Sequence, residues 1–340
     1  MAPTVPLSAK DFLRSQLLVK LPVPTKSFAG KTVIVTGSNT GMGLEGARHI
    51  ARLGAAKVIL AVRNLDKGKA AAESIVKTTG VSKDVVEVWE LDLSDYGSVE
   101  RFAARADAEL ARLDVVIENA GMMTQNFEYA GDDERTIKVN VFSTMLLAFL
   151  LLPKLRKTAE EFDAEVILTF TGSWMHWTTD FPEQDAPNIF EQLNKKDVAR
   201  MENHERYATS KLIGLLLFRE LYRNLTQPTR GRIITSLINP GGVYTDIMRD
   251  ENYTLAFRLQ SRLIQKLAMR TAEEGGRTLV HAAEGHHDTD GKYLADCKPA
   301  RSELLSPFVQ SEKGLKTQRK LWDELNAKLE SVKPGVTKNV

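Results

Sequence analysis

The sequence predicts an α/β fold: a doubly wound parallel sheet in a single domain, with an N-terminal leader and a C-terminal helix. Short apolar runs rich in Val and Ile alternate with longer stretches of helical periodicity. A glycine-rich turn joins the first of these strands to the first helix. Strands that alternate with helices need right-handed crossovers, so they lie parallel in one sheet. No internal repeat or low-complexity linker divides the 340 residues, so we expect one domain.

The first strand, turn and helix form a phosphate cradle. The strand covers 32–36 and the helix covers 44–54. Gly37 lets the chain turn sharply, Gly41 leaves room for a pyrophosphate, and Gly43 lets the helix lie close to the strand. Such a cradle belongs to a dinucleotide site, and we expect the remaining residues of the turn to bind the dinucleotide as well: Ser38, Asn39, Thr40 and Met42. A turn of this kind is a weak signal by itself, because loose packing of any strand–helix loop could explain it.

The rest of the chain continues the alternation. We expect further strands at 57–64, 85–91, 114–118, 166–170, 232–238 and 292–294, and helices at 66–77, 98–113, 137–155, 207–225 and 271–283. The predicted organisation is a leader (1–30), a nucleotide-binding domain (31–305), and a C-terminal helix and tail (306–340). A short amphipathic helix at 11–19 could fold back on the domain, touch a partner or rest on a membrane surface; we prefer the first. The tail from residue 333 is expected to be disordered.

Composition excludes several classes of protein. The formal net charge of +2 gives no reason to expect nucleic acid or an anionic membrane as a partner. The single cysteine, Cys297, excludes an internal disulfide and is expected to be structural. Residues 1–30 lack the apolar core of a secretory signal, and the longest apolar run, 145–152, is too short to cross a bilayer. We therefore expect a cytoplasmic protein without a transmembrane segment, in which 145–152 belongs to a core or dimer-interface helix.

Arg63 indicates which dinucleotide the site prefers. It follows Gly43 by twenty residues, at the end of the second predicted strand, where a nucleotide fold places the group that meets the adenosine ribose. An acidic residue there would bind the 2′-hydroxyl, but no carboxylate precedes Asp66. A guanidinium suits a phosphate monoester, so we expect NADP(H), with Asn64 beside it. The alternative is an exposed loop arginine without a ligand.

Tyr207 and Lys211 supply a candidate for proton transfer. Their i,i+4 spacing at the start of a predicted helix places phenol and ammonium on one helix face. A free tyrosine has a pKa of about 10, and a nearby cation lowers it toward the neutral range. Alone, this spacing is common and usually marks a solvated helix face; its value comes from the glycine turn upstream.

Taken together, these motifs resemble the short-chain dehydrogenase/reductase family, from about residue 31 to 294. Thr36–Gly43 matches the family's TGxxxGxG, and Tyr207 and Lys211 match its YxxxK. Further matches are Asp92 with Leu93 at the adenine, Asn119, Ala120 and Gly121 in the NNAG motif, Asn140 on the helix that follows, Ser173 after the fifth strand, and Pro240, Gly241, Val243 and Thr245 in PGxVxT beside the nicotinamide. Glu118 replaces the first Asn of NNAG, and we expect this replacement to be harmless.

The resemblance implies a Rossmann fold and a mechanism. Hydride would pass between the nicotinamide and a carbonyl carbon while Tyr207 exchanges a proton with the oxygen. Ser173 would hold that oxygen, Lys211 would lower the tyrosine pKa and bind the nicotinamide ribose, and Asn140 would hold a water that links Lys211 to solvent. The closest resemblance is to the retinol-dehydrogenase-like and WW-domain-oxidoreductase-like branch, in its fungal form with a similar leader and without a WW domain. The segment between Ser173 and Tyr207 is longer than is usual in the family.

The substrate side is predicted from position in the chain. It should be built from 122–130, 174–206 and 244–270, with Trp174, Met175 and Tyr244 as candidate contacts. The tryptophans favour an apolar or aromatic ligand, or simply pack against the core. The segment 178–206 is a lid or a surface insertion, with a short helix near 188–201. Neither His176 nor His204 has a partner at metal-ligand spacing, and His286 with His287 is expected to belong to a polar loop before the last strand, so we expect no metal.

The leading hypothesis is therefore an NADP(H)-dependent ketoreductase acting on a hydrophobic small molecule, with secondary metabolism as its setting. Two alternatives stay open. The chain could bind NADP(H) as a sensor or scaffold without turnover. It could also be a retinol- or steroid-type alcohol dehydrogenase held at a membrane surface by its leader. A homodimer through the helices at 137–155 and 207–225 is possible, unless the leader and tail cover those faces.

Overall fold

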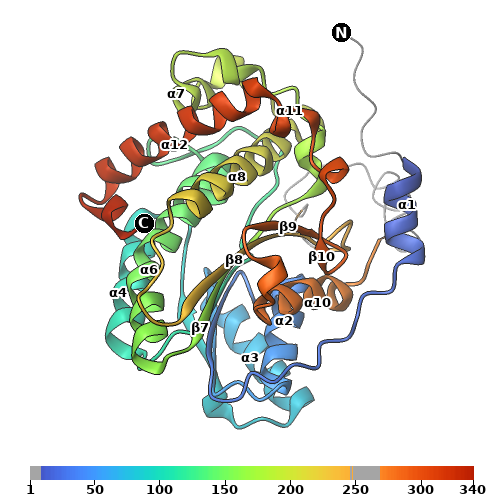
Figure 1. The fold of residues 1–340 in the computed structure, drawn as a ribbon, viewed down its shortest axis with the longest axis vertical. Coiled ribbons are helices and arrows are strands. Elements are labelled where there is room, and N and C mark those ends of the chain that lie inside the picture. Colours follow the sequence, from blue (N-terminus) through green and yellow to red (C-terminus); the bar gives the residue numbers. More distant parts are fainter. Residues whose placement is uncertain (1–8, 246, 248–268) are drawn as a thin grey trace.

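A computed structural model describes residues 9–245, 247 and 269–340 of the chain. Its main sheet has eight strands in the order β10-β9-β8-β7-β4-β1-β2-β3, and every neighbouring pair is parallel except β9 with β10 (Figure 1). The chain runs outward from β1 to β3 and then returns to place β4 on the other side of β1. The carboxyl ends of β1 and β4 therefore flank the crevice at which such sheets bind their ligands. The predicted Rossmann-type α/β fold is confirmed.

The strands correspond closely to the predicted ones. They are β1 (Thr32–Thr36), β2 (Lys57–Val62), β3 (Val86–Glu90), β4 (Val115–Glu118), β7 (Glu165–Thr171), β8 (Arg232–Asn239), β9 (Lys292–Ala295) and β10 (Lys298–Pro299). Sequence patterning missed β10 and a small hairpin of β5 (Tyr129–Ala130) and β6 (Asp133–Glu134). Strands of two residues are too short to produce an alternating apolar pattern.

The helices also follow the predicted order. They are α1 (Ala9–Leu18), α2 (Gly41–Arg52), α3 (Leu65–Thr79), α4 (Tyr96–Glu109), α5 (Arg135–Ile137), α6 (Thr144–Phe162), α7 (Ile189–Leu193), α8 (Glu205–Asn224), α10 (Ala272–Ala283), α11 (Pro307–Gln310) and α12 (Glu312–Val332). Helices α2, α3 and α10 cover one face of the sheet, and α4, α6 and α8 cover the other (Figure 1). Two buried apolar clusters, one on each face, hold these layers together.

The helix predicted at 137–155 is longer and less regular than expected. Helical structure runs from Arg135 through α6 to Phe162, with a π-helical turn, η2 (Lys138–Ser143), near its start. Its 28 residues are long and apolar enough to cross a membrane, which the 145–152 run alone did not suggest, but 83% of its most apolar window is buried inside the fold. Such burial is typical of a core helix in a soluble protein.

The C-terminal helix covers α8 and part of α6. Trp322 of α12 lies 5.7 Å from Phe149 of α6 between ring centroids. The chain then continues into a short helical turn, η10 (Val336–Asn339), with Val336 only 2% exposed. The prediction of disorder from residue 333 is therefore wrong. Pro334 and Gly335 end the helix, but the Glu330 carboxylate accepts the Gly335 and Thr337 amides at 2.6 and 2.9 Å and fixes the turn.

The insertion at 178–206 is structured and packs under α12. The Glu324 carboxylate of α12 accepts the backbone amides of Ile189 and Phe190 at the start of α7, at 2.9 and 3.1 Å. Because α12 buries surface of α6 and α8, the homodimer proposed through these two helices stays a prediction that has to accommodate this cover. The cysteine expected to be structural, Cys297, is 6% exposed, and burial raises the pKa of its thiol to about 12.

Candidate active site

The glycine turn has the geometry that the phosphate cradle requires. Gly37 has a φ of +64°, and a Cβ there would lie 2.9 Å from the Ala120 Cα. A Cβ on Gly43 would lie 2.5 Å from the Asn119 amide nitrogen. The turn is tied to the sheet because the Ser38 hydroxyl donates to Val35 O at 2.7 Å. Close approach of backbone from β1 and β4 thus leaves space only for glycine at these positions.

The loops after β1 and β4 are locked to each other by Thr36. Its hydroxyl accepts the backbone amides of Asn119 and Ala120, both at 2.9 Å. The Asn119 side-chain amide donates to Thr36 O at 2.8 Å. The NNAG-like segment therefore supports the glycine turn, and Asn119 acts on the site through this support.

A cavity of about 500 Å³ opens beside this turn. Eight of the residues predicted to bind the cofactor line it: Gly37, Asn39, Arg63, Asn64, Asp92, Leu93, Ala120 and Gly121. Lys67, which sequence reasoning missed, joins Arg63 at the cavity, and neither side chain has an ion pair among the described residues. The Asn64 side chain caps α3 by accepting the Lys67 amide at 2.9 Å. The cavity therefore presents two unpaired cations next to the phosphate cradle.

The remaining predicted cofactor residues surround the cavity without lining it in this structure. A Cβ on Gly41 would lie 3.4 Å from the Thr245 methyl group, which shows how close the PGxVxT-like segment comes to the glycine turn. Val243 forms an isolated bridge with Arg270 and lies against Gly275. Met42 also approaches Gly275, and Thr40 makes an interaction of its own.

Ser173, Tyr207, Lys211 and Asn140 come together at the carboxyl ends of β4 and β7. A hydrogen bond links the Tyr207 and Ser173 side chains, and the Lys211 ammonium lies 5.5 Å from the centre of the Tyr207 ring. Lys211 Nζ donates to Thr171 O at 2.8 Å. The Asn140 amide donates to Met122 O at 2.9 Å and to Ser210 Oγ at 3.0 Å. The long segment between Ser173 and Tyr207 thus leaves the predicted set intact.

The tyrosine pKa does not shift as expected. Burial raises the pKa of Tyr207 to about 12, and the Ser173 hydrogen bond lowers it by less. Burial also lowers the pKa of Lys211 to about 8. The predicted lowering of the Tyr207 pKa is therefore wrong for the protein by itself, because removal of the phenolate from water outweighs the hydrogen bond from Ser173.

Ser173, the predicted catalytic serine, is held by a buried neutral histidine. His176, 1% exposed, donates from Nδ1 to Ser173 O at 2.8 Å, and its Nε2 accepts the Ser306 amide at 3.3 Å. Burial lowers the pKa of His176 to about 4, which keeps the ring neutral. The Ser173 hydroxyl also accepts the Met175 amide at 3.1 Å. The sequence placed His176 near the site but could not reveal that it joins Ser173 to the C-terminal segment.

The leader helix reaches the substrate end of the site. Phe12 of α1 lies 5.2 Å from Trp174 between ring centroids. Gln16 Oε1 accepts the Gly242 amide at 3.1 Å, and Arg270, only 3% exposed, donates to Pro240 O at 2.8 Å and to Ser15 O at 3.0 Å. Of the three predicted interpretations of this helix, the structure agrees with folding back on the domain. Tyr244 is 42% exposed, and residues 246 and 248–268 of the predicted substrate side lie outside the described part.

Tyr293 of β9 is a second phenol that sequence reasoning missed. It is 7% exposed, it lies 5.4 Å from the His176 ring between centroids, and the neighbouring Tyr207 raises its pKa further above the value that burial gives. Its buried hydroxyl has no hydrogen-bond partner among the described residues. A tyrosine in a short last strand carries no pattern that could have identified it.

His281, Glu284 and His286 form a cluster whose ligand atoms lie within 4.8 Å of one another. Sequence reasoning missed it, because it considered His176, His204, His286 and His287 but not His281 or Glu284. Glu284 is already paired with His286 at 2.9 Å, and the Lys26 ammonium donates to the Glu284 carbonyl at 2.6 Å. A cation beside the cluster disfavours a metal ion, and the expectation of no metal stays a prediction.

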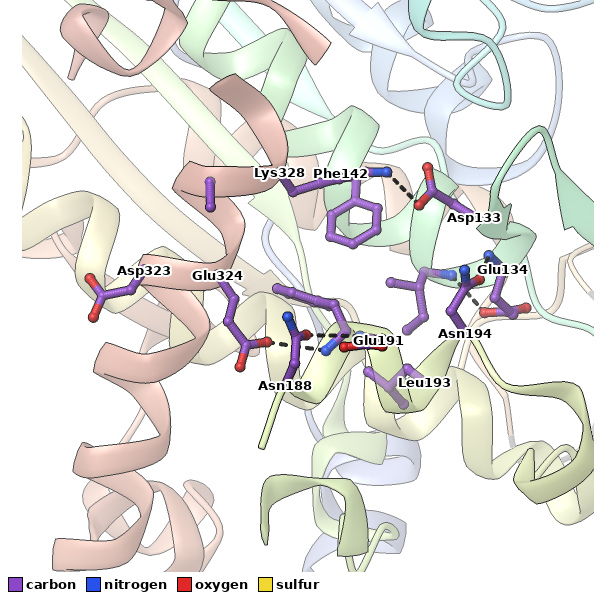
Figure 2. A pocket seen from close by; sticks show the side chains of 13 residues that line it. Asp133, Glu134, Phe142, Asn188, Glu191, Leu193, Asn194, Asp323, Glu324 and Lys328 are labelled. Atoms are coloured by element: carbon purple, nitrogen blue, oxygen red, sulfur yellow. Dashed lines mark hydrogen bonds and ion pairs between the residues drawn. The ribbon is translucent and has the colours of Figure 1, made fainter. Parts of the chain in front are cut away.

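A larger cavity, of about 600 Å³, lies away from these groups between α12, α7 and the β6–η2 region (Figure 2). None of the predicted catalytic residues lines it. Its side chains are largely engaged with one another: Lys328 pairs with Asp133 at 2.6 Å, and Glu324 caps α7. This cavity marks the junction of the insertion with the C-terminal helix.

Comparison with known proteins agrees with this geometry. The short chain dehydrogenase family model matches residues 31–169. The short chain dehydrogenase/reductase dmxR8 of Cryptosporiopsis sp. (strain 8999) is 42% identical over 96% of this chain and 99% of its own length. The short chain dehydrogenase atnD of Emericella nidulans is 46% identical over 82% of this chain and 87% of its own.

Solved structures share the fold. The Pseudomonas aeruginosa RhlG/NADP active-site complex has a TM-score of 0.58 at 22% identity, over 79% of this chain and 95% of that chain. A short chain dehydrogenase from Burkholderia cenocepacia in complex with NADP has a TM-score of 0.54 at 22% identity, over 79% and 97% of the two chains. The narrower retinol-dehydrogenase-like assignment stays a prediction. Sequence relatives that span nearly the whole chain, together with the fold, establish that this protein belongs to the short-chain dehydrogenase/reductase family of oxidoreductases.

Proposed function

We propose that this protein is an NADP(H)-dependent ketoreductase that acts on a carbonyl or secondary alcohol of a hydrophobic small molecule. The observation that carries the proposal is the convergence of Ser173, Tyr207 and Lys211 beside a glycine-lined cavity. A binding-only protein would need the cavity but not the hydrogen-bonded Ser173–Tyr207 pair. The fungal origin of several relatives is consistent with a role in secondary metabolism, and the cytosol is the compartment that we propose.

The preference for NADP(H) is supported by the charges around the cavity. Among the described residues, Arg63 and Lys67 line it without ion-pair partners, and Asp92 is the only acidic residue in its lining. The Asp92 carboxylate already accepts the Ser94 amide and hydroxyl at 2.8 and 2.6 Å. Two cations suit a 2′-phosphate, which an acidic residue near the ribose would repel. The cradle at Gly37 and Gly43, which a Cβ would fill, fits the pyrophosphate.

The chain's own residues would handle the proton and orient the substrate. When bound, the nicotinamide supplies or takes the hydride. Tyr207 donates a proton to the carbonyl oxygen during reduction, and Ser173 holds that oxygen through its hydroxyl. Lys211, charged at neutral pH with a pKa of about 8, stabilises the phenolate that forms.

An apolar substrate is supported by the walls at this end of the site. Phe12 and Trp174 form an aromatic pair from the leader and from the segment after Ser173. Met122 and Met123 line the adjoining cavity. Apolar and aromatic walls with a few polar groups are typical of sites for small hydrophobic ligands.

The test is steady-state turnover of NADPH, and separately NADH, with a panel of aromatic and aliphatic ketones. We expect consumption of NADPH that falls by at least about a hundredfold in Tyr207→Phe, because the proton donor is lost. Tight binding of NADPH without turnover on any ketone would instead favour the sensor alternative. A preference for NADH would contradict the role of Arg63.

Exposed leucines on the leader helix are consistent with the membrane-surface alternative. Leu13, Leu17 and Leu18 of the leader helix are 45%, 56% and 75% exposed. We would compare partition of the full chain and of a chain lacking residues 1–25 into phospholipid vesicles. Absence of leader-dependent partition would remove this alternative and leave the soluble ketoreductase.

A further inference from the structure

A cavity large enough for one water molecule lies next to the reaction centre, between β4, η2, β7 and α8. Its volume is about 30 Å³, close to the share of one molecule in liquid water. Its polar lining residues are Glu118, Asn140, Thr144, Thr171, Ser210 and Lys211. Among the residues that line it, from these elements and from α6 and β8, only Glu118 and Lys211 are titratable.

Two buried atoms of this lining have no hydrogen-bond partner among the described residues: Glu118 Oε1 and Thr171 Oγ1. The other lining groups are engaged. Asn140 bonds to Met122 and Ser210, and the Ser210 hydroxyl donates to Tyr207 O at 2.7 Å. A water needs two to four polar partners, and the two orphaned oxygens with the Lys211 ammonium provide them.

Glu118 is poorly suited to carry a charge. It is 2% exposed, and the one hydrogen-bond partner of its carboxyl among the described residues is the Thr36 hydroxyl, 3.3 Å from Oε2. That hydroxyl also lies 3.4 Å from Ile117 O, so a single proton serves both acceptors. A carboxylate removed from water with so little compensation is costly, and the protonated acid is the favoured form. Glu118 stands where the family motif has its first Asn, a replacement that we expected to be harmless, and it therefore introduces a proton donor.

We infer that Glu118 is a buried carboxylic acid that shares one water site with Lys211 and returns a proton to Lys211 after each reduction. The inference rests on the proposed function, since it assigns a role in the same reaction. Glu118 does not touch the substrate and acts through Lys211, so it is a positioning and proton-holding residue.

The proton steps balance. Tyr207 gives its proton to the carbonyl oxygen, and the phenolate takes one from the Lys211 ammonium. The neutral amine then takes a proton from the water in the cavity while that water takes one from the Glu118 carboxyl. A solvent proton finally restores Glu118, so one solvent proton is consumed per carbonyl reduced. Burial raises the pKa of Glu118 and lowers that of Lys211, which brings the two values toward each other and so reduces the cost of proton transfer between them.

The first test uses infrared spectroscopy without substrate or cofactor. At pH 7 the wild type should show the C=O stretch of a protonated buried acid, lost with a midpoint near pH 8 and missing in Glu118→Gln. In Lys211→Met the midpoint should rise, because the ammonium no longer stabilises the carboxylate. Absence of the band at pH 7, or the same titration midpoint in Lys211→Met as in the wild type, would overturn the inference. The wild type and Lys211→Met suffice if Glu118→Gln does not fold.

The second test is the pH profile of ketone reduction. Glu118→Gln should lower kcat about tenfold at pH 7 with KM unchanged, and should flatten the wild-type decline between pH 7 and 9. The control is Glu220→Gln, which removes a different buried glutamate, located on α8, and should keep the wild-type pH profile. A Glu118→Gln profile identical to that of the wild type would overturn the inference. Failure of the proposed function would appear separately, as a wild type without turnover but with the infrared band.

Discussion

The cofactor half and the substrate half of this molecule are built in different ways. The cofactor half comes from two neighbouring strand ends, β1 and β4, whose loops are fastened by Thr36. The proposed substrate half combines segments far apart in the chain: Phe12 from the leader, Trp174 after β7, Arg270 before α10 and Tyr293 on β9. The first half joins short motifs at the ends of two paired strands, whereas the second depends on packing between the leader, the loops and the C-terminal part of the sheet. Mutations should therefore affect the two halves differently.

The largest effect is expected from Gly37→Ala. A Cβ there would meet the Ala120 backbone at 2.9 Å, and the φ of +64° is strained for any other residue. We expect a loss of about 2 kcal/mol or more of unfolding free energy and of measurable NADPH binding. Chemical denaturation and fluorescence titration would measure the two effects. The matched control is Gly54→Ala, whose φ of +89° is similar but whose added Cβ meets nothing within 4 Å. Equal losses of NADPH binding in both variants would mean that close approach to β4 is unimportant.

Arg63→Ala should weaken the cofactor half without disturbing the fold. Arg63 is exposed and lines the cavity, so its removal costs one charge-assisted contact, roughly a tenfold or greater rise in the Kd for NADPH. The Kd for NADH should change by much less. Isothermal titration with both cofactors gives the ratio. An unchanged NADPH/NADH ratio would assign the 2′-phosphate to another residue, with Lys67 the next candidate.

Phe12→Ala should act on the substrate half alone. Loss of the ring against Trp174 should raise KM for apolar ketones several-fold, about fivefold to tenfold, and leave the Kd for NADPH unchanged. Leu17→Ala on the exposed side of the same helix, where the side chain is 56% exposed, is the control and should change neither. If both variants behave alike, α1 is a structural cover and not a wall of the pocket.

The effect that is smallest at neutral pH, and that grows as the pH falls, is on the stability contributed by His176. Burial lowers the pKa of His176 to about 4, so below its ordinary value of 6.5 the unfolded chain binds a proton that the folded chain does not. Stability contributed by His176 is thus complete above pH 6.5 and is lost as the pH falls toward 4, by about 1.4 kcal/mol per pH unit. The raised pKa of Glu118 makes its contribution to stability fall as the pH rises from 4.5 to 8, opposite in sign to that of His176. The test therefore compares the unfolding free energy of His176→Asn with that of the wild type at each pH. A difference between the two that does not vary from pH 7 to 5 would show that the fold leaves the pKa of His176 at its ordinary value.

Sequence reasoning succeeded where one segment carries the whole signal. The alternation of strands with helices predicted the sheet, and the glycine turn, Arg63, Ser173, Tyr207 and Lys211 lie where their motifs placed them. It failed where a role depends on a distant partner. His176 acts by bridging to Ser306. The tail is ordered by Glu330 and by Arg156, whose guanidinium donates to Asn339 O, and such contacts leave no periodic pattern. The pKa of Tyr207 was misjudged because the sequence shows the cation but not the depth of burial.

The most direct test of the account is transfer of deuterium from NADPH labelled at nicotinamide C4. With a ketone from the panel that is turned over, the label should appear on the carbinol carbon of the product, and Tyr207→Phe should suppress this transfer while still binding NADPH. That result would establish the cavity and the Ser173–Tyr207–Lys211 group as one reaction centre. Tight NADPH binding by the wild type with no label in any product would contradict the account and leave a nucleotide-binding protein without this chemistry.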